Sequence, residues 1–183
     1  MRKAVLALAC ACALSIPLVA ATLAEVTLPD SITVGNQTLV LNGLGLRTKL
    51  FMKIYVGGLY LEKKSGDAPA IIQSDTIKRV VLQFIYGEVT REQMVESFSD
   101  GFKANAAGAI KSQVDQFLGA LDTMKKGEQL VATYVPGTGT TLTVRGKDKL
   151  TIAGLPFAQA LFSVWLGPKP PTSDLKSGML GKK

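Results

Sequence analysis

Residues 41–62 read LNGLGLRTKLFMKIYVGGLYLE, and this pattern predicts two long neighbouring strands. The first half alternates, with leucines on one face of a strand and Gly43, Gly45 and Arg47 on the other. The second half, residues 51–61, is almost entirely apolar or glycine, which predicts a strand buried on both faces. An arginine beside so apolar a strand either reaches water with its charged end or holds an anion in an apolar place. Arg47 is therefore the first candidate binding residue.

Strand patterns joined by short turns occupy most of the remaining chain, and helical patterns interrupt them. Gly35-Asn36 is a favourable two-residue hairpin turn, and Thr90 with Gln93 three residues later forms a capping box at the start of a helix. Strands are expected at residues 26–28, 31–34, 37–46, 51–61, 78–85, 129–135, 140–145 and 149–152. Helices are expected at residues 68–73, from Thr90, after Ala106-Ala107-Gly108 as far as residues 125–127, from Phe157, and at residues 174–179.

The order of these elements predicts an α+β fold. Strands connected by short turns form an antiparallel sheet, and amphipathic helices must cover one of its faces. No repeat, low-complexity tract or linker divides residues 25–183, so a single domain is expected there.

The N-terminus has the layout of a secretory signal peptide. Arg2 and Lys3 form a short basic start, an apolar run follows over residues 4–20, and small residues suited to cleavage end the segment near residue 24. The expectation is a signal peptide at residues 1–24 and export to the periplasm of a Gram-negative bacterium. A retained membrane anchor is the alternative; once the leader is removed, no stable membrane span is expected.

Composition excludes several classes of function. The chain contains no histidine, and its two cysteines, Cys10 and Cys12, lie within the predicted leader. Histidine-based triads, cysteine nucleophiles and nearly all zinc or copper sites are thereby excluded, and we expect no metal and no cofactor. The net charge is +7, but the basic residues are scattered without interleaved aromatics, which argues against nucleic acid binding. Weak attraction to anionic ligands or lipid headgroups remains open.

An ordered set of short motifs resembles the chalcone isomerase superfamily, and more closely its bacterial exported members, the chalcone isomerase-like proteins. The set covers residues 30–181 and consists of Asn42-Gly43-x-Gly45-x-Arg47, Lys53-Ile54-Tyr55-x-x-x-Leu59-Tyr60-Leu61, Gly101-Phe102-x-x-Asn105, Lys126-Gly127, Tyr134-Val135-Pro136-Gly137-x-Gly139-Thr140 and Leu161-Phe162-Ser163-Val164-Trp165-Leu166-Gly167. The resemblance implies an open-faced β-sandwich, which is a large antiparallel sheet with helices on one face and a ligand cleft between the layers. The resemblance implies one of the family's activities: members cyclise chalcones to flavanones, bind fatty acids without catalysis, or assist polyketide pathways.

The resemblance also implies roles for particular residues. In the enzymes of the family an arginine stabilises an enolate, and in the fatty acid binders it holds the carboxylate. This arginine falls on Arg47. A family threonine falls at Tyr55, so Arg47 and Tyr55 are the candidate catalytic residues. Other polar positions of the enzymes fall near Met94, Gly101 and Val164, whose side chains donate no hydrogen bond. The resemblance therefore implies a poor chalcone isomerase.

The leading hypothesis is a protein that binds a small amphipathic or anionic ligand, fatty-acid-like, between sheet and helices. The candidate ligand-binding residues are Arg47, Tyr55, Tyr60, Met94, Phe98, Phe102, Leu161 and Val164. Two alternatives stay open, an intramolecular lyase or isomerase acting on a chalcone- or enone-like substrate, and a structural or partner-binding envelope protein. For Arg47 the alternative is a strand arginine that reaches water or pairs with an acid such as Glu62 or Glu88. The apolar candidates would equally suit an ordinary core.

Overall fold

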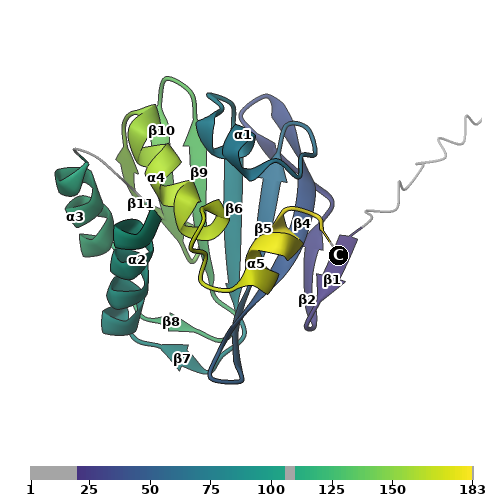
Figure 1. Cartoon of the computed structure of the whole chain (residues 1–183), viewed down its shortest axis with the longest axis vertical. Coiled ribbons are helices and arrows are strands. Elements are labelled where there is room, and N and C mark those ends of the chain that lie inside the picture. Colours follow the sequence, from purple (N-terminus) through teal and green to yellow (C-terminus); the bar gives the residue numbers. More distant parts are fainter. Residues whose placement is uncertain (1–19, 106–109, 183) are drawn as a thin grey trace, which may run out of the picture.

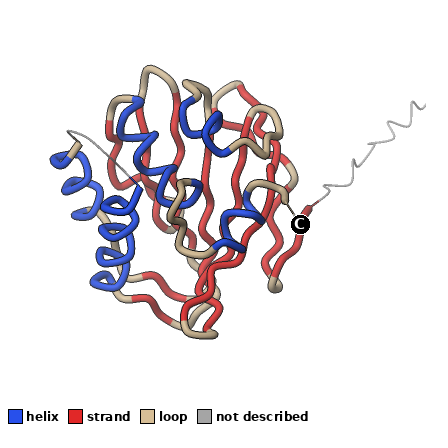
Figure 2. The backbone as a smooth tube through the Cα atoms, viewed as in Figure 1, coloured by secondary structure: helices blue, strands red, loops and turns tan. Residues whose placement is uncertain are grey.

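A curled antiparallel sheet of seven strands forms the centre of the molecule (Figures 1 and 2). The computed structural model describes residues 20–105 and 110–182. From one edge of the sheet to the other the strands are β11 (Lys147–Ile152), β10 (Gly139–Val144), β9 (Gln129–Val135), β6 (Lys78–Phe84), β5 (Met52–Leu61), β4 (Gln37–Lys49) and β3 (Ser31–Val34). Every neighbouring pair is antiparallel, which confirms the expected sheet.

The helices pack on one face of this sheet, as Figure 1 shows. They are α1 (Ala68–Gln73), α2 (Arg91–Asn105), α3 (Lys111–Gly119), α4 (Leu155–Leu166) and α5 (Ser173–Met179). Helix α4 is apolar on nearly every side because it lies between the sheet and the other helices. The open-faced β-sandwich is therefore confirmed. Within the described residues, no helix is both long enough and apolar enough to cross a membrane.

A small two-stranded ribbon covers part of the opposite face of the sheet. It consists of β1 (Ala20–Leu23) and β2 (Val26–Pro29), and Val26 and Leu28 are buried against Leu39 of β4 and Tyr60 of β5. The predicted leader boundary at residue 24 falls inside this ribbon and stays a prediction. The first part of the predicted leader, with Cys10 and Cys12, lies outside the described residues.

Several element boundaries differ from expectation. Strand β4 continues to Lys49 and β5 starts at Met52, so a tight turn at Leu50-Phe51 joins them. Both turn residues have left-handed backbones, with φ of 48° and 68°, at a cost of about 1 kcal/mol or more each for side chains of this kind. The helix expected as far as residues 125–127 is wrong at its end: α3 stops at Gly119, because β8 (Met124–Lys125) pairs with β7 (Glu88–Val89). The expected link at residues 106–108 lies outside the described residues.

The start of α2 is anchored twice. In the predicted capping box, the Thr90 amide donates to Gln93 Oε1 at 3.0 Å and the Gln93 amide donates to Thr90 Oγ1 at 3.3 Å. Further support comes from Thr123, whose hydroxyl accepts from the Arg91 amide at 3.0 Å while its carbonyl accepts from Arg145 at 3.2 Å.

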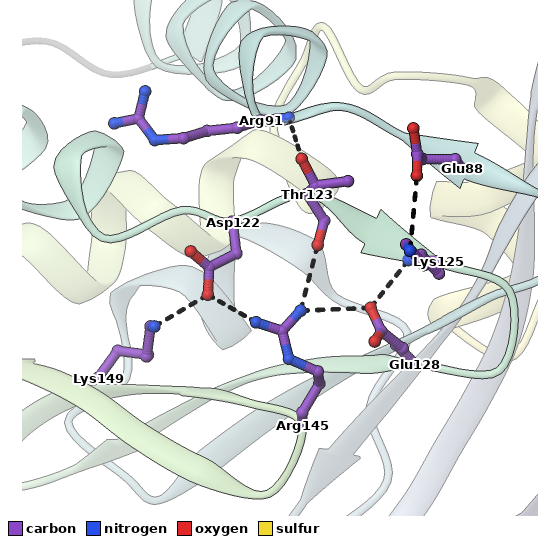
Figure 3. A network of polar contacts seen from close by, with 8 residues as sticks. All are labelled: Glu88, Arg91, Asp122, Thr123, Lys125, Glu128, Arg145 and Lys149. Atoms are coloured by element: carbon purple, nitrogen blue, oxygen red, sulfur yellow. Dashed lines mark hydrogen bonds and ion pairs between the residues drawn. The ribbon is translucent and has the colours of Figure 1, made fainter.

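An ion-pair network extends from Arg145, as Figure 3 shows. Its guanidinium lies 2.8 Å from Asp122 and 3.3 Å from Glu128, and Lys149 lies 2.9 Å from Asp122. The hydrogen bond from Lys149, together with the charges of both cations, holds the pKa of Asp122 below its usual value. Single exposed pairs contribute little to stability, but this network joins the β10–β11 turn to the segment that anchors α2. The network therefore supports the start of α2, while the buried side chains of that helix pack in the core.

Candidate functional site

Arg47 lies near the end of β4, between the sheet and the helical layer. Its partner across the strand pair is Tyr55 of β5, and the guanidinium carbon is 5.6 Å from the centre of the Tyr55 ring. From the helical side, Ser97 of α2 accepts a hydrogen bond from Arg47 Nη1 at 2.7 Å. The side chain is half-buried rather than extended into water.

No carboxylate neutralises this arginine among residues 20–105 and 110–182. Glu62 accepts from the Ile77 amide at 2.9 Å, and Glu88 lies 4.0 Å from Lys125. The alternative of an internal ion pair with either acid is therefore wrong. The Arg47 Nε is buried and has no hydrogen-bond partner among the described residues. Because a buried donor without a partner is costly, this atom marks a place where a further acceptor is favoured.

A cavity of about 290 Å³ opens beside Arg47. It lies between the end of the β4–β5 hairpin, the end of β6, strand β7 and the first turns of α2. Its lining combines apolar side chains with two cations and several neutral polar groups. It consists of Arg47, Lys49, Leu50, Met52, Ile54, Tyr55, Phe84, Tyr86, Val89, Gln93, Met94 and Ser97. The arrangement of two charged donor groups, Arg47 and Lys49, with several apolar walls is typical of sites for small amphipathic molecules.

A second hollow, of about 260 Å³, touches Arg47 from the other side. It runs between α2 and the segment after α4, and its walls include Lys169 together with the carboxylates of Glu96 and Asp100. Two carboxylates disfavour an anion there. An anionic ligand with an apolar body therefore suits the first cavity better than the second.

The profile of the chalcone isomerase-like family matches residues 20–181. The chain belongs to the chalcone isomerase-like family. A crystal structure of an Arabidopsis thaliana fatty-acid binding protein is similar, with a TM-score of 0.72 and 15% identity over 88% of this chain and 95% of that chain. At that identity the likeness shows the fold alone. The comparison with curated proteins gave no match.

Of the predicted site residues, Arg47, Tyr55 and Met94 line the cavity of this chalcone isomerase-like chain. Tyr60 lies elsewhere, on the opposite face of the sheet, where its hydroxyl donates to the Pro29 carbonyl at 2.8 Å. Burial, with a further contribution from the charge of Asp30, raises the pKa of Tyr60 to about 12. The reason for its position is alternation, because residues five apart in a strand point to opposite faces.

The other four predicted residues, Phe98, Phe102, Leu161 and Val164, belong to the packed core between α2, α3 and α4. The Phe98 ring lies 5.0 Å from Phe117 and 5.8 Å from Trp165, both edge-on. Val164 packs against Gly101, where an added Cβ would lie 2.6 Å from its Cγ1. None of the four lines either cavity beside Arg47.

Sequence reasoning missed Ser97 and Gln93. Gln93, Ser97 and Gly101 follow one another at four-residue spacing, so they form a polar and small stripe next to the apolar stripe of α2. Ser97, in the middle of that stripe, meets Arg47 near the end of β4. The spacing was visible in the sequence, but the strand it would meet was not. Among the described residues, no group of three or more acidic, histidine or cysteine side chains is arranged to hold a metal.

Proposed function

We propose that this protein binds a small amphipathic anion, fatty-acid-like, in the 290 Å³ cavity, with the acidic head at Arg47. The observation that carries the proposal is the half-buried guanidinium at the edge of a largely apolar cavity, with a buried Nε that has no partner in the described part of the chain. The fatty-acid binding protein of similar fold supports the same class of ligand.

The chemistry of the lining matches the two ends of such a ligand. A guanidinium offers planar donors that fit a carboxylate, and Gln93 with Ser97 adds further polar atoms beside it. Apolar side chains such as Ile54 and Phe84 surround the rest of the space. Because ligand pockets usually measure about 300–1,000 Å³, a cavity of 290 Å³ favours a small or short-chain acid over a long one.

Arg47→Ala is expected to weaken binding of the preferred acid by about thirtyfold, since a charge-assisted hydrogen bond contributes about 2 kcal/mol. Titration calorimetry with a series of fatty acids of increasing length measures this. Arg79→Ala is the matched control, because Arg79 is also a strand arginine bonded to one hydroxyl, Thr133 at 2.7 Å, but lines neither cavity. Equal affinities for wild type and Arg47→Ala would contradict the proposal, as would a loss of the same size in Arg79→Ala.

We also propose that this protein lacks efficient chalcone isomerase activity. Arg47 and Tyr55 lie together, but Met94 at the cavity and Gly101 with Val164 in the core supply no side-chain donor where the enzymes have one. We expect wild type and Arg47→Ala to convert a chalcone at indistinguishable rates in an absorbance assay. A wild-type rate well above that of Arg47→Ala would favour the isomerase alternative.

We propose further that the protein is exported to the periplasm. Support comes from Arg2 and Lys3 followed by the apolar run of residues 4–20. Cleavage after residue 24 would remove β1, whereas the family match begins at residue 20. The mass of the protein isolated from its host distinguishes the possible cleavage points, and an uncleaved N-terminus in the cytoplasm would overturn the proposal.

A further inference from the structure

The end of the β4–β5 hairpin presents large apolar side chains to water. We call residues Lys49–Lys53, with the sequence KLFMK, the hairpin tip. Phe51 is fully exposed and Leu50 is 78% exposed. The tip is the lowest blue loop in Figure 1 and projects beyond the sheet and helices. Single exposed apolar residues are common, but two adjacent ones at a projecting turn form a contact surface.

The backbone conformation of the hairpin tip shows that Leu50 and Phe51 do not favour the fold. Leu50 and Phe51 both have left-handed φ values, 48° and 68°. Turns with this geometry at both central positions favour Asn-Gly, and bulky side chains there are strained. The Phe51 side chain is fully exposed, so its apolar surface gains nothing from the fold. The Phe51 side chain therefore suits a role outside the folded core, and most of the Leu50 side chain is exposed beside it.

The charges around the turn indicate the kind of partner. Lys49 and Lys53 flank the apolar residues, and residues 47–53 contain no acid. Neither lysine pairs with a carboxylate within the part of the chain that the structure describes. Two exposed apolar side chains between two lysines are complementary to a surface with anionic groups above an apolar layer.

We propose that the hairpin tip inserts into the surface of an anionic lipid bilayer. Leu50 and Phe51 enter the boundary between headgroups and acyl chains, and the two lysines meet the lipid phosphates. Lys49, Leu50 and Met52 also line the cavity beside Arg47, so its entrance lies next to the bilayer in this orientation. The proposal does not depend on a bound ligand, because insertion uses the exposed surfaces of Leu50 and Phe51 and the two lysines, whether or not the cavity is filled.

Flotation with lipid vesicles tests the proposal, using the mature chain with the N-terminus found in the protein isolated from its host. Wild type is expected to float with vesicles of phosphatidylglycerol mixed with phosphatidylcholine, and at least tenfold less with phosphatidylcholine alone. The double variant Leu50→Asn, Phe51→Gly is expected to lose at least tenfold of this binding while melting at or above the wild-type temperature, since Asn-Gly suits the turn. The raised or equal melting temperature shows that a loss of flotation is not a loss of fold.

Charge is tested separately with a matched pair of variants. Lys49→Gln with Lys53→Gln is expected to reduce binding about tenfold or more. Lys63→Gln with Lys64→Gln removes the same charge beyond the opposite end of β5, and is expected to change binding less than twofold. Arg47→Ala is expected to float like wild type even if it loses its ligand, which separates this proposal from the preceding one.

Three results would overturn the proposal. The first is equal flotation of wild type and the Leu50→Asn, Phe51→Gly variant. The second is an equal loss in both lysine pairs, which would reduce the effect to net charge. The third is a wild-type dimer in solution that the turn variant abolishes while neither protein floats, because the tip would then be a contact between two copies of the chain.

Discussion

Gly45→Ala is expected to lower the free energy of unfolding by about 3 kcal/mol or more, as a Cβ at this position has no room. Gly45 lies on β4 directly under α5, and an added Cβ would come closer than 3 Å to three backbone atoms of Leu175. Backbone atoms cannot rotate away as a side chain would, so the whole of α5 must move. That movement uncovers Leu175 and Met179, which are fully buried. The midpoint of thermal unfolding should fall by about 10 °C.

The prediction has a control and an internal check. Gly119→Ala is the control, because a Cβ there meets no atom within 4 Å and no loss of stability is expected. Gly178→Ala is the check: Gly178 contributes the same contact from α5, where a Cβ would lie 2.6 Å from the Cα of Gly45. The two changes disrupt one interface, so the double variant should be less destabilised than the sum of the single variants. Full additivity, or a normal melting temperature for Gly45→Ala, would contradict the close packing of α5 on β4.

Stability is expected to rise by about 2 kcal/mol from about pH 7 to about pH 9.5, owing to Lys78. Lys78 is completely buried at the start of β6. Its ammonium group donates to the Ile71 carbonyl at 2.8 Å and to the carbonyl and hydroxyl of Ser74 at 2.5 and 3.1 Å. Burial lowers the pKa of Lys78 from 10.5 to about 8, with a nearby carboxylate, Asp75, acting in the opposite direction.

The sign follows from counting protons in the two states. Between about pH 8 and pH 10.5 the unfolded chain still holds a proton on Lys78 that the folded chain has released, so raising the pH favours the folded state. Below pH 8 both states are protonated, and the burial cost is constant. Above pH 10 the effect reverses, because the pKa values of Tyr60 and Tyr134 are raised to about 12 and only the unfolded chain loses those protons.

Urea unfolding at a series of pH values measures this effect, and Lys78→Met is the variant that tests its origin. The variant removes the titrating group while keeping much of the buried volume, so the rise in stability between about pH 7 and about pH 9.5 should disappear, whatever its absolute stability. Lys64→Met alters an exposed lysine and should keep the wild-type slope. A slope that survives in Lys78→Met would show that another group causes it.

The strands and helices of this protein were largely predictable because their signals are local. The strand pattern along residues 37–46 and the capping box at Thr90 each depend on neighbours within a few residues, and both elements are present in the structure, although a register shift between Leu41 and Gly43 interrupts the alternation. The errors arose where a distant partner intervenes. The end of α3 at Gly119 depends on β8 pairing with β7, which lies far back in the sequence.

The candidate site was predictable in its charged residue and less so in its lining. Arg47 stood out as a cation in an apolar stretch, and the strand that follows it placed Tyr55 nearby. Tyr60 was wrongly included, although alternation alone places it on the other face of the sheet, because it is five residues from Tyr55. Phe98, by contrast, has the same apolar spacing whether it packs in a core or lines a cavity, and only its contact with Trp165 and Phe117 distinguishes the two.

Periodicity, turn chemistry and composition were enough to establish an antiparallel sheet with one helical face, a family resemblance and the absence of histidine chemistry. They act over a few residues or over the whole chain, so a linear reading captures them. The empty space beside Arg47, its bond to Ser97 and the projection of Phe51 depend on how β4, β5 and α2 meet in three dimensions. These contacts depend on packing between segments that are tens of residues apart in the sequence, and no local pattern encodes them.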